Sequence, residues 1–380
     1  MTAIITEPKK MCRSSRGAEP IAPPDVFINK KLLFMRNFAI IAATTIMAIS
    51  SAFQSDACSR VVYKGDTDII MVGRTLDWRT PIPTNLYVYP QGVRKTSMPS
   101  APCLEWTSKY GSVIAVGYDG GVTEGMNEAG LVMNGLFCKG TVYKIATGTG
   151  DTPVVSLAML VSYFIDNFAT VEEAYSWLQA NEFAIFGKTF DGGTVSTLHW
   201  ALTDRSGDTL VMEYTDGDLR LYRGPQYTVL TNDPTLDKMM AINEYWEGIG
   251  GKYMLPGTVR SADRFVRASY FINHVPKNYG YAEALGCIES IMGVVSVPYG
   301  YELPGEPNVS STQWRSVADI GTGKYYIKFA QSTGDMWIDM GRLQFNPGAP
   351  ILKLDTTANI EATGCVNGLL KKSDGFRPMW

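Results

Sequence analysis

The chain has 380 residues, of which 45% are hydrophobic, and its 34 lysines and arginines against 37 aspartates and glutamates give a formal net charge of −3. This length and composition suffice for a sizeable core in one large domain or two smaller ones. The near balance of charge, with no basic stripe, argues against a nucleic-acid partner. From residue 58 onward no apolar run approaches the ~20 residues of a membrane span.

The first 57 residues have the pattern of a secretory signal. Basic residues at 30, 31 and 36 precede an almost unbroken apolar run over 38–49, and small or polar residues follow. Ser55 and Ala57 are small side chains of the kind a signal peptidase prefers, which predicts a cut between Ala57 and Cys58. We expect a dispensable leader or over-extended start at 1–34, a signal peptide at 35–57, one folded domain at 58–380, and export to the periplasm or medium. A buried helix is the alternative for the apolar run.

Short strands joined by turns dominate the chain after Cys58. A hairpin with its turn at 65–66 opens the domain, and Arg74 and Asp77 lie at the polar end of its second strand. Further strands are expected at 113–118 and 131–137, in a meander over 199–232, and in a hairpin over 313–330.

Helices are expected at 154–168, 171–181, 236–246, 262–272 and 281–292. The second is amphipathic and follows Thr170, a capping residue, with two glutamates in its first turn. No internal repeat or long linker interrupts the chain. Hairpins interleaved with groups of helices predict an α+β domain in which helices pack on antiparallel sheets.

The six cysteines and two histidines limit the possible chemistry. No two cysteines are closely paired, so neither a zinc site nor a dense disulfide framework is indicated. His199 lies in a strand and His274 near a helix end, where structural histidines are common, and neither is near a nucleophile motif such as GxSxG. We expect no metal or other cofactor, and a hydrolase of this sequence needs a general base other than histidine.

A cysteine exposed by processing supplies nucleophile and base together. A free α-amine has a pKa of about 7.7 to 8.0 and a thiol about 8.5, so the amine of Cys58 can accept the thiol proton near neutrality. Such a site also needs a carboxylate for the amine, a cation near the thiolate and donors for the oxyanion. Pairing of the first two strands brings Arg74 and Asp77 back beside Cys58. An ordinary ion pair is the alternative for these two residues.

Four sequence stretches carry a family resemblance. They are ACSRVVYKGDTDIIMVGRTLDW, GYDGGVTEGMNEAGLVMNGL, VLTNDP and LPGTVRSADRFVRASY, in this order. In order and character, the residues from Cys58 to about Phe345 resemble the choloylglycine hydrolase and penicillin V acylase family of N-terminal nucleophile hydrolases, nearest its exported bacterial branch. The resemblance implies a four-layer αββα sandwich of two antiparallel sheets, hydrolysis of linear carboxamides through a cysteine thioester, and a homotetramer.

The resemblance also implies a role for each catalytic residue. Cys58 attacks the amide carbonyl and relays the proton through its own amine. Asp77 holds that amine, Arg74 favours the thiolate, Asn232 donates to the oxyanion, and Arg264 orders the cluster.

Alternatives remain at several of these positions. Asn232 can instead cap the following helix, and Arg264 can be a solvated helix residue. Arg267 is an alternative to Arg264, because positions three apart on a helix point in similar directions. Phe137 stands where many members of the family have Asn or Tyr, so its backbone N–H is the donor it can offer. Trp78 either lines the acyl pocket or is a core aromatic.

The substrate is a small-molecule amide of one of two classes. Glycine- or taurine-conjugated bile acids are the main expectation, by analogy with the exported branch, and penicillin V or N-acyl homoserine lactones are the alternative. A hypothesis of another class makes Cys58 a lipidation site and the mature protein a membrane-anchored binding lipoprotein. Ser55 and Asp56 argue against it, because a lipidation site prefers an aliphatic residue and then a small one at these two positions.

Overall fold

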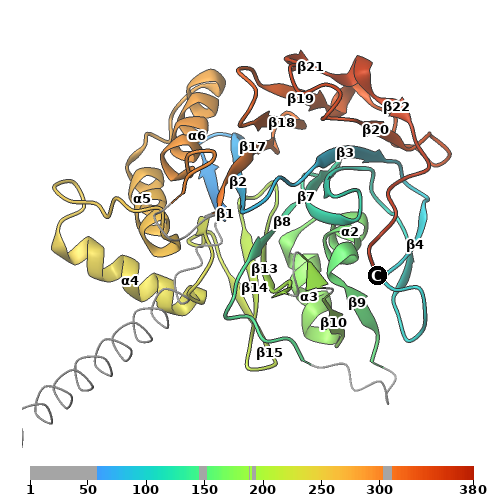
Figure 1. Ribbon diagram of the computed structural model, residues 1–380, viewed down its shortest axis with the longest axis horizontal. Helices are drawn as coiled ribbons and strands as arrows, with labels where there is room; N and C mark the ends of the chain where they lie inside the picture. The colour runs from blue at the N-terminus through green and yellow to red at the C-terminus, as the bar shows by residue number, and fades with distance from the viewer. Residues whose placement is uncertain (1–57, 145–151, 188, 191–193, 303–309) are drawn as a thin grey trace, which may run out of the picture. The chain divides into compact units, whose positions relative to one another are not determined.

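Two large sheets form the middle layers of the protein in the computed structural model, which describes residues 58–144, 152–187, 189–190, 194–302 and 310–380 (Figure 1). The first sheet consists, in spatial order, of β16 (Val229–Leu230), β1 (Cys58–Lys64), β2 (Ile70–Trp78), β17 (Ser311–Asp319), β18 (Lys324–Phe329), β19 (Met336–Asp339) and β21 (Gly364–Cys365). Its neighbours are antiparallel except for β19 and β21.

The second sheet is antiparallel throughout. It consists of β15 (Asp218–Arg223), β14 (Thr209–Thr215), β13 (Leu198–Thr203), β8 (Val132–Phe137), β7 (Gly121–Asn127), β6 (Ser112–Gly117), β3 (Thr84–Tyr89), β20 (Leu352–Leu354) and β22 (Lys371–Lys372). Smaller pairs are formed by β4 (Arg94–Thr96) with β5 (Glu105–Thr107), β9 (Val154–Ser156) with β10 (Ala184–Phe186), and β11 (Thr189–Phe190) with β12 (Thr194–Val195).

Helices cover the outer face of each sheet. Two of them, α5 (Ser261–His274) and α6 (Tyr281–Val295), pack on β1 and β2, and α4 (Leu236–Ile249) packs against α5. On the other side, α2 (Leu157–Asn167) packs on β7 and β8, and α3 (Val171–Ala180) packs on β14. Figure 1 shows these two groups of helices on opposite sides of the strands. The short 3₁₀ helices η1 (Met340–Arg342) and η2 (Asn367–Leu369) lie in the last part of the chain. The fold is the expected αββα sandwich.

Three hydrophobic cores correspond to these layers. The core between the sheets joins Val72 and Leu76 of β2 to Val113 of β6 and Val132 of β8. A second core lies between the second sheet and α2. A third joins the first sheet to α5 and α6 and also includes residues of β8, β13 and β14, and Cys58 belongs to it. Each fully buried aliphatic side chain contributes ~1.5–3 kcal/mol, and β1 is held by packing on both faces, because Val61 lies in the third core and Val62 in the first.

Most predicted elements are confirmed, and the differences lie mainly at helix ends. Residues 154–156 are strand β9, paired in parallel with β10, and not the first turn of a helix. The helix begins after Ser156, whose side chain accepts a hydrogen bond from the Ala158 N–H as its cap. The helix expected at 236–246 continues to Ile249, where Gly250 at φ 155° ends it. Thr170 caps α3 as predicted.

The predicted leader and signal peptide fall outside the described residues, and the residues from Cys58 onward belong to one compact unit. Within the described part of the chain, no helix combines the length and apolarity needed to cross a bilayer.

Candidate active site

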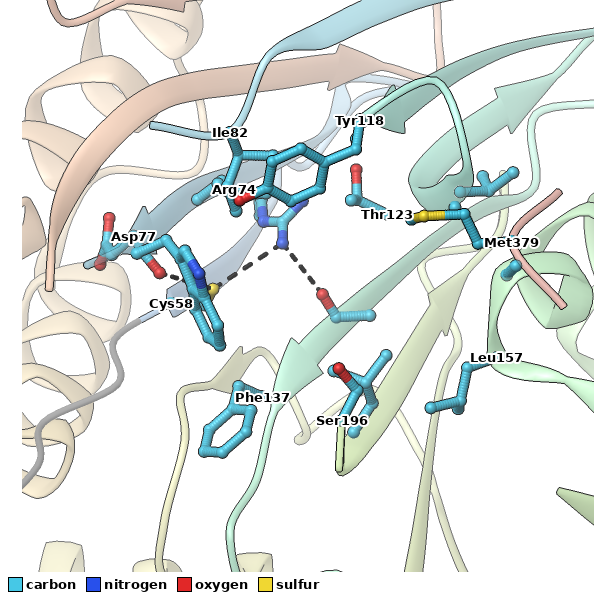
Figure 2. Close-up of a pocket in the computed structure, with 18 residues that line it drawn as sticks. Cys58, Arg74, Asp77, Ile82, Tyr118, Thr123, Phe137, Leu157, Ser196 and Met379 are labelled. Atoms are coloured by element: carbon cyan, nitrogen blue, oxygen red, sulfur yellow. Dashed lines mark hydrogen bonds between the residues drawn. The ribbon is translucent and has the colours of Figure 1, made fainter. Parts of the chain in front are cut away.

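Cys58, the first residue of β1, lies at one end of a pocket with mostly apolar walls (Figure 2). The apolar lining comes from both sheets, α2 and the last residues of the chain: Leu76, Trp78, Ile82, Val122, Phe137, Leu157, Ala158, Leu198 and Met379. Figure 2 shows Arg74 and Asp77 beside Cys58, and Leu157 and Met379 at the opposite end. Charged groups therefore gather at the thiol end of the pocket.

Strand pairing brings Arg74 to the thiol, as predicted. In the antiparallel register Cys58 lies opposite Leu76, and Arg60 lies opposite Arg74. The Nη2 of Arg74 donates to the Sγ of Cys58 at 3.8 Å and to the carbonyl oxygen of Gly135 at 3.0 Å. Burial disfavours the charged guanidinium, but its interactions with Glu124 and Cys58 raise the pKa of Arg74 above its ordinary value. Arg74 thus presents a permanent positive charge to the thiol.

Glu124 of β7 holds Arg74 in place, and the sequence interpretation missed it. Its carboxylate accepts hydrogen bonds from the Nη1 of Arg74 at 2.7 Å, from Asn134 at 3.1 Å, and from the hydroxyls of Ser316 and Tyr325. Glu124 is 1% exposed. Arg74 therefore pairs with Glu124, and the suggested ordinary Arg74–Asp77 ion pair is not the arrangement found. The one available signal was a carboxylate within the family-like stretch GYDGGVTEGMNEAGL.

Asp77 is a buried carboxylate with spare acceptor capacity. Its Oδ2 accepts from the Thr75 hydroxyl at 3.2 Å and lies 3.9 Å from the Nη1 of Arg264. Burial raises the pKa of Asp77 to about 6, although Arg264, Thr312, Thr75 and Arg74 act in the opposite direction. Its Oδ1 has no hydrogen-bond partner among the described residues. A buried acceptor of this kind is ready to receive an additional donor.

Asn232 joins the start of β1 to the end of β8. Its Oδ1 accepts from the backbone nitrogen of Cys58 at 2.6 Å and from the Nη2 of Arg264 at 2.7 Å, and its Nδ2 donates to the carbonyl oxygen of Phe137 at 2.7 Å. These contacts fix the orientation of the amide and leave one Nδ2 hydrogen for a further acceptor. The N-cap of α4 is Thr235, so the helix-cap alternative for Asn232 is wrong.

Arg264, and not Arg267, belongs to the cluster. Arg264 is fully buried on α5, and its Nη1 donates to the carbonyl oxygen of Cys58 at 2.7 Å and to the Ser59 hydroxyl. Burial lowers its pKa from the ordinary value, against the opposing effect of Asp77. The Nη1 of Arg267 donates instead to the carbonyl oxygens of Pro256 and Thr258. The solvated alternative for Arg264 is therefore wrong.

Trp78 and Phe137 form an aromatic pair in the pocket wall. Their ring centroids lie 5.7 Å apart in an edge-to-face arrangement. Phe137 lies opposite Leu198, and the next residue donates its N–H to the carbonyl oxygen of Thr197, just before β13, at 2.9 Å. Consecutive N–H groups of a strand point in opposite directions, so the Phe137 N–H points away from β13. It lies on the same side as the Phe137 carbonyl oxygen, which accepts from the Nδ2 of Asn232.

His199 is buried, and both of its ring nitrogens have partners. Its Nδ1 lies 2.7 Å from the Oε1 of Glu213, and its Nε2 lies 2.7 Å from the carbonyl oxygen of Thr231. Among the described residues, Cys138, His199 and Glu213 are the group whose ligand atoms lie close enough to hold a metal ion. Both imidazole nitrogens are already engaged with protein oxygens, so these residues do not fit a metal ligand set.

Comparison with known proteins identifies the family. The family described as linear amide C–N hydrolases, choloylglycine hydrolase family, matches residues 58–353 of this chain. The chain belongs to the choloylglycine hydrolase family. It is an amidohydrolase that acts on linear amide C–N bonds. The match begins at Cys58, the residue around which the buried cluster is built.

The relatives of this chain include proteins named for both substrate types. It is 38% identical to a penicillin V acylase of Pectobacterium atrosepticum, over 88% of this chain and 96% of that protein. A bile salt hydrolase/transferase of Bifidobacterium longum is 26% identical, over 71% and 91%. A solved penicillin V acylase from Agrobacterium tumefaciens superposes with a TM-score of 0.78 at 42% identity, over 85% of this chain and 99% of that one.

A solved mutant of conjugated bile acid hydrolase from Clostridium perfringens shares the fold, with a TM-score of 0.65 at 21% identity over 77% of this chain and 95% of that one. The family and fold predicted from the sequence are thereby confirmed. For the substrate, the comparisons favour the penicillin V acylase alternative over the bile-salt expectation.

Proposed function

We propose that this member of the choloylglycine hydrolase family is an acylase that removes phenoxyacetyl-type acyl groups from amides such as penicillin V. The observation that carries the proposal is the likeness, at 38% and 42% identity, to two penicillin V acylases. The pocket supports it, because apolar side chains line the space leading away from the thiol of Cys58. The aromatic pair of Trp78 and Phe137 in the pocket wall suits contact with a phenoxy ring.

The mechanism we propose uses the amine and thiol of Cys58 after the chain is cut between Ala57 and Cys58. The amine removes the thiol proton while Sγ bonds to the amide carbonyl carbon. The tetrahedral intermediate collapses, the C–N bond breaks, and the proton passes from the amine to the leaving nitrogen. Water then attacks the thioester with the same amine as base. The C–S bond breaks, the sulfur regains a proton, and the carboxylic acid leaves.

The surrounding residues take the roles that their contacts suit. Arg74, 3.8 Å from the sulfur, stabilises the thiolate. The free Nδ2 hydrogen of Asn232 and the N–H of Phe137 stabilise the oxyanion. Arg264 positions Asn232 and the carbonyl of Cys58. The unpartnered Oδ1 of Asp77 receives a hydrogen of the new amine.

Export with removal of residues 1–57 is part of this proposal, because an uncut Cys58 nitrogen is an amide and cannot act as a base. Intact mass of the secreted protein tests it. A mass equal to that of a chain starting at an unmodified Cys58 supports the acylase. A mass increased by a diacylglyceryl group supports the lipoprotein hypothesis instead.

Substrate class is tested by hydrolysis of penicillin V, a glycine-conjugated bile acid and a taurine-conjugated bile acid side by side, with Cys58→Ala as the blank. We expect the highest kcat/KM for penicillin V. Higher values for both bile-acid conjugates would overturn the substrate proposal while leaving the amidohydrolase assignment intact.

A further inference from the structure

Residues Ser373–Trp380, here called the strap, cross the second sheet and return to the active-site pocket. The strap lies beyond residue 353, where the family match ends. The N–H of Ser373 donates to the carbonyl oxygen of Ile351, and the N–H of Phe376 donates to the Tyr89 hydroxyl at 3.1 Å. The Phe376 ring packs edge-to-face on the rings of Tyr87 and Tyr89, 6.0 and 6.3 Å away. The strap is therefore anchored by specific contacts along its length.

The strap ends against the loop between β6 and β7 (residues 118–120). The N–H of Met379 donates to the carbonyl oxygen of Gly120 at 2.8 Å, and a Cβ on Gly120 would lie only 2.5 Å from the Cγ of Met379. The loop is itself fixed, because the Asp119 carboxylate accepts hydrogen bonds from Asn85 and from the Nζ of Lys353, at 2.8 and 2.6 Å. A firmly held loop thus supports the Met379 side chain.

Met379 lies at the end of the pocket opposite Cys58. Figure 2 shows Cys58 with Arg74 and Asp77 at one end, and Met379 with Leu157 at the other. An acyl group whose carbonyl carbon sits at Sγ must extend along the apolar lining toward that far end. Its last atoms then meet the strap.

We infer that the strap closes the acyl pocket and that Met379 sets the length of acyl group the enzyme accepts. The inference rests on the proposed acylase function and specifies it further. Replacing Met379 by alanine removes the three heavy atoms beyond Cβ, which makes room for about two methylene groups of substrate. Each methylene newly buried is worth about fourfold in kcat/KM, so the longest substrates gain roughly tenfold or more.

The experiment measures kcat/KM for straight-chain N-acyl derivatives of 6-aminopenicillanic acid with acyl chains of about six to about twelve carbons. The wild-type enzyme, Met379→Ala and Met379→Trp are compared, each with its melting temperature. We expect Met379→Ala to move the preferred length upward by about two carbons and Met379→Trp to move it downward. Met254→Ala is the control, since Met254 is 53% exposed and lies outside the pocket lining, and its profile should match the wild type.

If kcat/KM depends on acyl length in both Met379 variants as it does in the wild type, the inference is overturned while the acylase proposal stands. A wild-type enzyme that cleaves neither penicillin V nor any of these derivatives would overturn the proposed function itself. Because the two substitutions predict opposite shifts, loss of fold in one variant leaves the other as a test.

Discussion

The buried carboxylate of Asp77 should lower the stability of the fold in exchange for catalysis. Its pKa is about 6 in the folded chain against an ordinary 3.8, so ionised Asp77 destabilises the fold by about 3 kcal/mol at about 1.4 kcal/mol per pKa unit. Because the folded pKa lies above the unfolded one, the folded chain holds this proton more tightly. The penalty is absent below the unfolded pKa, grows as pH rises between the two values, and is complete above the folded pKa.

Asp77→Asn keeps the size of the side chain and removes the charge. In a chain that retains Ala57, where the nitrogen of Cys58 is an amide as in this structure, we expect the variant to be more stable by up to about 3 kcal/mol at pH 8 and nearly equal at pH 4. Urea denaturation at the two pH values measures both differences.

The same substitution in a chain that begins at Cys58 is the matched comparison. There the α-amine donates a hydrogen bond to the carboxylate, and it becomes positively charged once it has taken the thiol proton, so the stability gain shrinks while kcat/KM collapses. If Asp77→Asn instead destabilised the Ala57-retaining chain at pH 8, the contacts with Arg264 and Thr75 would outweigh burial, and the reasoning would be refuted.

Four further predictions concern the other members of the cluster. Cys58→Ala should leave a folded, inactive enzyme and Cys58→Ser at most a trace of turnover; full activity in either rules out a cysteine nucleophile. Asn232→Ala should lower kcat by roughly 10²–10³, as for other oxyanion donors, and single-turnover kinetics check this. Arg264→Ala should reduce kcat far more than Arg267→Ala, whose contacts lie outside the cluster; equal losses contradict the assignment. Glu124→Gln should destabilise by about 3–5 kcal/mol in urea, because it leaves the buried Arg74 without its counter-charge; a change within about 1 kcal/mol contradicts that view.

Local sequence signals predicted what local geometry decides. The turn after β1 returns β2 antiparallel, so Arg74 had to come back beside Cys58 whatever the rest of the chain did. The cap at Thr170 and the helices on both outer faces follow from similarly short-range patterns. Residues 154–156 were misassigned because an apolar segment fits either a strand or a helix, and pairing with β10, about thirty residues later, decides between them.

Contacts between distant segments could not be predicted from local sequence patterns. Glu124 is held by residues of β2, β8, β17 and β18, and no spacing within its own motif indicates that these strands converge on it. The choice between Arg264 and Arg267 likewise depends on which face of α5 meets β1. Met379 had no periodic pattern to connect it with the pocket, since the strap has no regular secondary structure.

In the proposed mechanism, the charge balance of the cluster lets a cysteine nucleophile work without a histidine. Three arginines, Arg60, Arg74 and Arg264, are fully buried near the start of β1. Arg60 belongs to β1, and the other two donate hydrogen bonds to Cys58. Asn134 links Arg60 to Glu124, which in turn pairs with Arg74, and Asp77 faces Arg264. Within this described network two carboxylates oppose three guanidinium groups, and burial lowers the pKa of Arg60 to about 9 despite the opposing effect of Glu124.

A buried excess of one positive charge is unfavourable unless an anion compensates it. In the proposed mechanism, the thiolate of Cys58 and then the oxyanion of the tetrahedral intermediate are anions formed next to this excess. The network thus stabilises the charged states of the reaction more than the neutral thiol, which is the condition for catalysis by electrostatic preorganisation. The α-amine then has only to move a proton, and no imidazolium is required beside the sulfur.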